Sequence, residues 1–160
     1  EWPETWAWKD DCISDNGVHP IAREAIYRSI HRLVSKVMIL NQKGEVVRGK
    51  IERGHFVGHW TLPGGNMDHD EHPAIGCVRE TLEEMGIEIE LTNDAPIITQ
   101  RIFTDEGISF VSFTYKSQWS GDDSEIKLKE NEISEFAWLS KSDAISKAVS
   151  GFDIAALMHL

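Results

Sequence analysis

The pattern of hydrophobic and polar positions predicts a series of short strands with a few helices between them. After Pro20, apolar residues recur at helical spacing, which predicts a helix with one apolar face. Residues 33–40 have the pattern of a buried strand, residues 41–44 form a turn signal, and residues 45–48 begin a partner strand. Further strands are expected at 87–91, 111–115, 125–129 and 136–139. Strands interleaved with helices predict an α/β or α+β domain with a mixed sheet.

The clearest helical pattern runs from Pro73 to Met85 and stops at Gly86, a residue favoured just beyond a helix C-terminus. One stripe of this helix can face a core; it consists of Ala74, Val78, Thr81, Leu82 and Met85. Three carboxylates fall on the opposite side, and they are Glu80, Glu83 and Glu84. Because like charges three and four residues apart destabilise a helix, this arrangement favours a bound cation.

A hard divalent cation fits such a cluster best. Mg²⁺ prefers a few carboxylates, keeps several waters and completes its shell with substrate phosphates. Gly64 and Gly65 precede the helix and allow the backbone to approach a metal or a phosphate closely. Arg79 is always charged, and its planar group can orient a neighbouring glutamate.

Length and charge narrow the class of protein. The chain has 160 residues, which points to one domain, and no apolar run approaches the roughly 20 residues that span a bilayer. No signal-peptide pattern opens the chain, and its two cysteines do not form a disulfide framework, so the cytoplasm is the expected location. The formal charge of −11 argues against a nucleic acid partner, which requires a basic surface.

The spacing of the charged and glycine positions resembles the Nudix box, the signature of the Nudix hydrolase family. The matching positions are Gly65-x5-Glu71-x7-Arg79-Glu80-x2-Glu83-Glu84-x-Gly86-Ile87. A later segment, Glu132 to Leu139, resembles the family's late strand preceded by glutamates. Two positions depart from the usual pattern, since Thr81 replaces a bulky aliphatic residue and Asn66 replaces a basic residue.

The resemblance implies an α/β/α sandwich with a mixed sheet and assigns a role to each box position. Metal binding by Mg²⁺, with Mn²⁺ as an alternative, is expected at Gly64, Glu80, Glu83 and Glu84. Glu84 or Glu83 is expected to be the general base, with Glu132 as the rival. Structural support is expected from Arg79 and Glu71, and substrate contacts from Arg48, Arg53 and Gly65. Residues 31–160 would form the Nudix domain, and residues 1–30 a tryptophan-rich extension and helix of unassigned role.

The expected activity is hydrolysis of a phosphoanhydride bond in a nucleoside diphosphate linked to another moiety. Nucleotide sugars, ADP-ribose, dinucleotides and nucleoside triphosphates all remain open as substrates, because pocket shape outside the box sets specificity. The alternative is a non-catalytic Nudix domain that binds a nucleotide-like ligand as a sensor. A homodimer is common in the family and is a further expectation.

Overall fold

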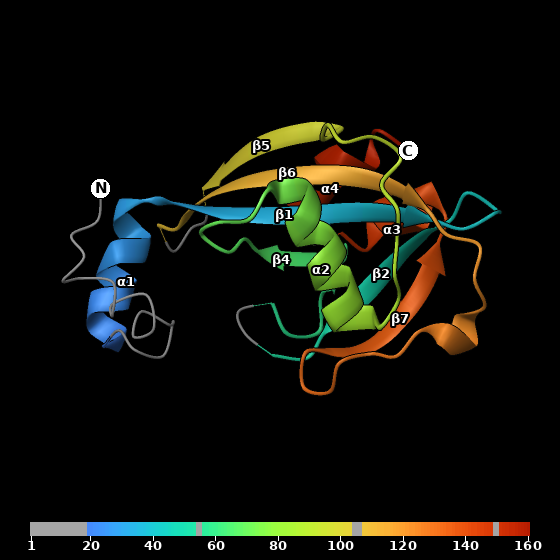
Figure 1. The fold of residues 1–160 in the computed structure, drawn as a ribbon, viewed down its shortest axis with the longest axis horizontal. Coiled ribbons are helices and arrows are strands. Elements are labelled where there is room, and N and C mark those ends of the chain that lie inside the picture. The colour runs from blue at the N-terminus through green and yellow to red at the C-terminus, as the bar shows by residue number, and fades with distance from the viewer. Residues whose placement is uncertain (1–18, 54–55, 104–106, 149–150) are drawn as a thin grey trace.

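The computed structural model describes residues 19–53, 56–103, 107–148 and 151–160. Its helices are α1 (Pro20–Ser29), α2 (Pro73–Met85), α3 (Lys141–Ser146) and α4 (Gly151–Leu157), with a short 3₁₀ turn, η2 (Asp123–Glu125). Its strands are β1 (His31–Leu40), β2 (Val46–Ile51), β3 (Trp60–Thr61), β4 (Gly64–Asn66), β5 (Ile98–Phe103), β6 (Ser109–Gln118) and β7 (Ile133–Leu139). Figure 1 shows α2 in front of the sheet and α3 and α4 behind it.

The strands form one mixed sheet in the order β3-β2-β1-β6-β5, with β4 also paired to β1 and β7 to β2. Strand β1 runs parallel to β6 along its whole length, from His31 opposite Ser109 to Leu40 opposite Gln118. The other strand pairs are antiparallel. The mixed sheet predicted from the sequence is therefore confirmed.

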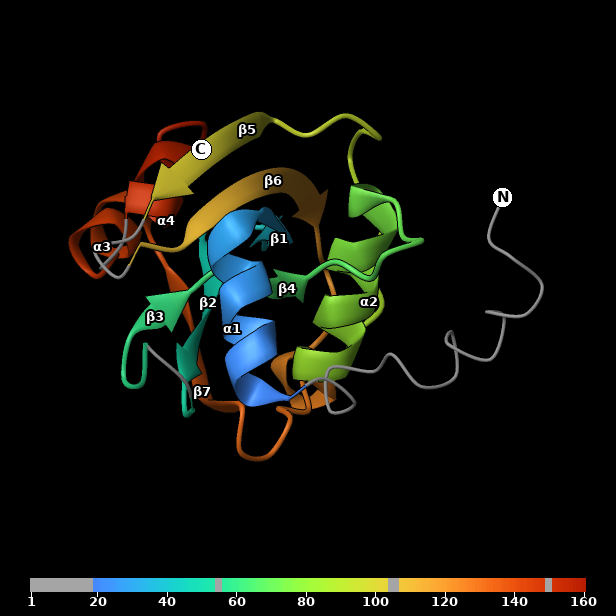
Figure 2. The ribbon, with the colours of Figure 1, turned by 90° about the vertical axis from the view of Figure 1, so that its left-hand side faces the viewer.

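Two hydrophobic cores lie on the two faces of the sheet, and β1 contributes to both. Val37 and Ile39 face the core beneath α2, whereas Met38 and Leu40 face the core beneath α3 and α4. This alternation follows from the two-residue period of a strand. Seen from the side in Figure 2, α2 covers one face, and α3 and α4 cover the other, which confirms the α/β/α sandwich.

Helix α2 has the predicted bounds and carries the box residues. Pro73 occupies its first turn, and Gly86 ends it in the left-handed conformation at φ 69°, donating its N–H to the Leu82 carbonyl. The buried stripe differs from the predicted one, because Cys77 lies at its centre while Leu82 is exposed. Thr81 is fully buried, and its hydroxyl donates to the Cys77 carbonyl at 2.7 Å. The threonine at this box position is thus accommodated by a bond within the helix.

Two predicted strands are not strands in the structure. Residues 87–91 alternate correctly, with Ile87 and Ile89 buried, but they make only one isolated bridge, between Leu91 and Ser117. Residues 125–129 contain the end of η2 and then an irregular stretch. In that stretch, Lys127 and Lys129 donate their N–H groups to carbonyls at the end of α2. Both segments therefore make single backbone hydrogen bonds to neighbouring elements and do not form the continuous pairing of a β-strand.

Helix α1 lies at the N-terminal end of β1 and projects away from the sheet (Figure 1). The apolar face predicted for this helix is not buried, because Ile26 is exposed, as are Ile30 just beyond the helix and Leu33 on β1. The tryptophan-rich segment before it lies outside the described residues. No helix among the described residues has the length and apolar character needed to cross a membrane.

Candidate active site

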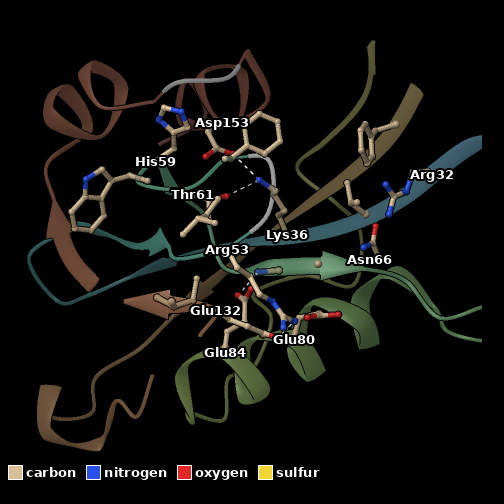
Figure 3. Close-up of a pocket in the computed structure, with 18 residues that line it drawn as sticks. Arg32, Lys36, Arg53, His59, Thr61, Asn66, Glu80, Glu84, Glu132 and Asp153 are labelled. Atoms are coloured by element: carbon tan, nitrogen blue, oxygen red, sulfur yellow. Dashed lines mark hydrogen bonds and ion pairs between the residues drawn. The ribbon is translucent and has the colours of Figure 1, made fainter. Parts of the chain in front are cut away.

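A pocket of about 460 Å³ opens between α2 and one end of the sheet. Figure 3 shows Glu80, Glu84 and Glu132 along one side of it, with Lys36, Thr61 and Asp153 on the side opposite. The lining residues are Arg32, Val34, Lys36, Ile51, Arg53, Phe56, His59, Trp60, Thr61, Gly64, Gly65, Asn66, Glu80, Glu84, Phe110, Glu132, Ile133 and Asp153. Most of the residues expected from the sequence to form the site therefore meet in one place.

The two glycines of the box loop lie in close packing, and at Gly64 this packing requires glycine. Gly64 has φ 134°, and a Cβ atom there would lie 2.1 Å from the carbonyl oxygen of Ser35 on β1. A Cβ atom on Gly65 would lie 2.6 Å from the carboxyl carbon of Glu80. A side chain at Gly64 would collide with the β1 backbone, whereas one at Gly65 would displace the Glu80 carboxylate.

Glu84 lines the pocket and is hydrogen-bonded to the box loop. Its Oε2 accepts the N–H of Gly64 at 3.0 Å. The pKa of Glu84 is raised to about 7, mainly by burial and in smaller part by the charges of Glu80 and Glu132. The Gly64 hydrogen bond and the charge of Lys36 act in the opposite direction. Burial likewise raises the pKa of Glu80, so two desolvated carboxylates lie together on this side of the pocket.

Arg79 joins the other acidic residues of the box. Its Nε and Nη2 donate to the two oxygens of Glu71, at 2.7 and 3.0 Å. Its Nη1 donates to Glu80 at 2.9 Å and to Glu83 at 3.0 Å. The Arg79 hydrogen bond lowers the pKa of Glu71, which also accepts the N–H of Asp68. These contacts fit the supporting roles expected for Arg79 and Glu71.

The other acidic candidates differ in how they face the pocket. Glu83 does not line it, and its side chain is 43% exposed between Arg79 and Lys129. Glu132 lines the pocket from the loop before β7 and pairs with Arg53 and Lys129. Arg53 also lines the pocket and is largely exposed. Glu84 and Glu132 are thus the two candidate bases that can reach a bound molecule directly.

The oxygen atoms of the box glutamates suit a hard divalent cation, although in this structure the carboxylates are hydrogen-bonded to Arg79 and to the Gly64 amide. Across the described residues, no three His, Cys, Asp or Glu side chains are grouped as a metal site. Glu80 and Glu83 point to Arg79, and Glu84 points to the Gly64 amide. A cation at this position would exchange these contacts for its own and would neutralise the buried charges of Glu80 and Glu84.

Arg48 does not occupy the position expected for a substrate contact. Its side chain is 0% exposed, and it donates to Asp153 at 2.7 Å and to the carbonyls of Ala144 and Trp60. Burial lowers the pKa of this guanidinium, and the Asp153 charge opposes that effect. The expectation for Arg48 is corrected, because an arginine in the middle of β2 faces the core beneath α3 and not the pocket.

Sequence reasoning missed Lys36, Thr61 and Asp153, which together line the pocket opposite the glutamates. Lys36 gave one usable signal, since it is the only charged residue in the apolar segment 33–40. A charged residue in a buried strand usually has a specific partner. Asp153 gave no such signal, because it lies in a short helical stretch distant in sequence from the box.

Comparisons with known proteins identify the family of this chain. A family model for the NUDIX domain matches residues 30–158. An RNA pyrophosphohydrolase from Roseobacter denitrificans is 27% identical over 140 residues, which cover 79% of this chain and 87% of that protein. The MutT protein from Methanosarcina mazei has a similar structure, with a TM-score of 0.69 and 22% identity, covering 81% of this chain and 94% of that one. The NUDIX domain of Shewanella oneidensis NrtR, solved with ADP ribose, gives a TM-score of 0.64 at 17% identity. The match covers 88% of this chain and 96% of that one.

The structural likenesses establish a shared fold, and the family match extends over most of the chain. The box loop and α2 both contribute residues to the pocket. The chain therefore belongs to the NUDIX family and is a Nudix hydrolase, an enzyme of the pyrophosphohydrolase class.

Proposed function

We propose that this enzyme hydrolyses a phosphoanhydride bond in a small substrate that contains a nucleoside diphosphate, and that it requires Mg²⁺, with Mn²⁺ as an alternative. The observation that carries the proposal is one pocket lined by Glu80, Glu84 and Glu132 on one side and by Lys36 on the other. Carboxylates recruit a divalent cation, and cation and lysine together attract the phosphates between them.

The metal ligands in this proposal are Glu80, Glu84 and the Gly64 carbonyl, joined by Glu83 once it leaves Arg79. A bound cation would neutralise the diphosphate and lower the pKa of a coordinated water. Arg79 and Glu71 hold the box loop against α2. Gly65, whose lack of a side chain lets Glu80 lie against the loop, is assigned to contact the substrate through its backbone.

Glu84 is the side chain that we assign first as the general base. It lines the pocket, and its carboxylate would accept a proton from a water bound beside the proposed cation. Glu132 is the rival, since it lines the pocket from the loop before β7. Glu83 ranks below both, because it lies outside the pocket lining. Comparison of Glu84→Gln with Glu132→Gln assigns the base to the residue whose loss lowers kcat more.

The substrate proposal is a nucleoside diphosphate linked to another moiety, with a nucleoside triphosphate as the other form. A pocket of about 460 Å³ lies within the range that holds small ligands. Arg53 lines the pocket and is largely exposed, so we assign it a contact with phosphate or sugar. The net charge of −11 favours a small nucleotide over a long nucleic acid.

A substrate panel tests this proposal. Phosphate release, coupled to a phosphatase where needed, is measured with nucleotide sugars, ADP-ribose, dinucleotides and deoxynucleoside triphosphates in millimolar Mg²⁺ or in EDTA. We expect turnover of one class that disappears in EDTA. Turnover that persists in EDTA would contradict the metal requirement. No turnover, together with ligand-induced thermal stabilisation, would favour the alternative of a non-catalytic sensor domain. The presence of all three box glutamates, Glu80, Glu83 and Glu84, argues against that alternative.

Two further expectations from the sequence remain predictions, namely a cytoplasmic location and a homodimer. Light scattering coupled to size-exclusion chromatography tests the second.

A further inference from the structure

A buried polar cluster lies in the pocket wall opposite the box glutamates. Lys36 on β1 donates through Nζ to Thr61 Oγ1 at 2.9 Å and to Asp153 Oδ1 at 3.2 Å. Asp153 on α4 accepts a further bond from Arg48 at its other oxygen, at 2.7 Å. The side chains of Lys36 and Asp153 are only 16% and 3% exposed. The cluster therefore joins β1, β2, β3 and α4 in one network.

Lys36 and Arg48 share the carboxylate of Asp153, one at each oxygen. Arg48 takes its oxygen in the interior, whereas Lys36 takes the other at the pocket wall. A charged group in such a place is costly unless opposite charge lies close to it. Because Lys36 lines the pocket, an anion bound there would come close to its ammonium group.

The position of Lys36 relative to the box carboxylates defines what it can bind. Lys36 and Glu84 line the same pocket from opposite sides, as Figure 3 shows. An anion between them would meet the lysine ammonium on one side and the proposed cation of the glutamates on the other. A diphosphate has oxygens on both of its sides and fits this arrangement.

We propose that Lys36 is a phosphate-binding residue of this enzyme and that Asp153 is the positioning residue that holds its ammonium in the pocket wall. The inference rests on the proposed diphosphate substrate and names a contact for it outside the Nudix box. Thr61 accepts a second hydrogen bond from the Lys36 ammonium group. Together, Asp153 and Thr61 therefore orient the ammonium group before the ligand binds. Arg48 contributes indirectly, because it anchors Asp153 from behind.

The test measures binding of methylene diphosphonate, a diphosphate analogue whose bridging carbon resists cleavage. Its Kd is determined by calorimetry in millimolar Mg²⁺ for the wild type, Lys36→Met and Lys50→Met. Lys50 is a matched control, because it is a β2 lysine paired with Glu135 on the surface and does not line the pocket. We expect Lys36→Met to raise Kd about 10- to 100-fold, as for loss of one charge-assisted hydrogen bond, and Lys50→Met to leave it unchanged.

A double-mutant cycle separates positioning from folding. Asp153→Asn should weaken binding, and Lys36→Met combined with Asp153→Asn should bind no more weakly than Lys36→Met alone. Circular dichroism and thermal unfolding check that each variant is folded, and Lys36→Gln replaces Lys36→Met if the latter is not. No measurable binding to the wild type, or an equal Kd in the wild type and the folded Lys36 variant, would overturn the proposal. Failure of the proposed function would appear separately, as absent turnover in the substrate panel.

Discussion

Replacing Glu84 by Gln should make the metal-free protein more stable at alkaline pH while it impairs the enzyme. The pKa of Glu84 rises from 4.5 to about 7, mainly by burial. Between these values the folded state holds a proton that the unfolded state has lost. The free energy of unfolding therefore falls as the pH rises through this range. Glutamine keeps an oxygen that can accept the Gly64 N–H and carries no charge to desolvate.

The magnitude follows from the same values. One pKa unit corresponds to about 1.4 kcal/mol, so the full cost of ionising Glu84 in the folded protein is about 3 kcal/mol. At pH 8 both states are ionised and the whole cost applies. At pH 5 the folded state is almost fully protonated, and the cost is below about 1 kcal/mol. The stability difference between Glu84→Gln and the wild type should thus grow by about 2–3 kcal/mol from pH 5 to pH 8.

Urea denaturation in EDTA at both pH values measures this difference. Comparison of the two proteins cancels the titration of every other group to first order. Glu88→Gln is the control, because Glu88 is exposed just beyond α2. Added Mg²⁺ should stabilise the wild type more than Glu84→Gln, since only the former offers the carboxylate. A Glu84→Gln variant that is less stable than the wild type at pH 8 would refute the reasoning.

Three further substitutions follow from the same geometry. Gly65→Ala places a methyl group 2.6 Å from the Glu80 carboxyl carbon and should displace that carboxylate. The Mg²⁺ concentration for half-maximal activity should therefore rise by about tenfold or more. An unchanged Mg²⁺ titration would show that the methyl group does not disturb Glu80. Arg79→Lys loses the fork that holds Glu71 and Glu80 and should lower kcat/KM by about tenfold or more together with the melting temperature, which steady-state kinetics and thermal unfolding check. Arg48→Met leaves Asp153 with Lys36 alone and should cost about 3 kcal/mol in the free energy of unfolding, whereas a stability equal to the wild type would show that the buried pair is dispensable.

The sequence predicted the fold well where local signals and burial agree. Pro73 and Gly86 mark both ends of α2, and the apolar segment 33–40 lies within the central strand β1. The strand predicted at residues 87–91 was wrong. The alternation of apolar residues correctly indicated which side chains are buried, but it could not indicate whether another strand lies alongside to pair with. Strand pairing is a property of the assembled sheet, and the alternation of one segment contains no information on it.

The candidate site divides in the same way. The box residues are close together in sequence, so their spacing on one helix already places Glu80 and Glu84 side by side. Arg48 and Asp153 are 105 positions apart, and their pairing depends on how α4 packs behind β2. An arginine near a phosphate-binding motif suggested a substrate contact, but the chain buries it as an ion pair instead. Pairs of this kind become visible only in the folded structure.

The most direct test of the account measures kcat/KM of the wild type and Glu84→Gln with the best substrate of the panel at saturating Mg²⁺ and pH 8. General base catalysis contributes about 10²- to 10⁴-fold, so we predict a loss of at least about 100-fold in the variant. The loss should occur in a protein that is folded and, without metal, more stable than the wild type. A loss of less than about tenfold would contradict the assignment of Glu84 to the catalytic centre.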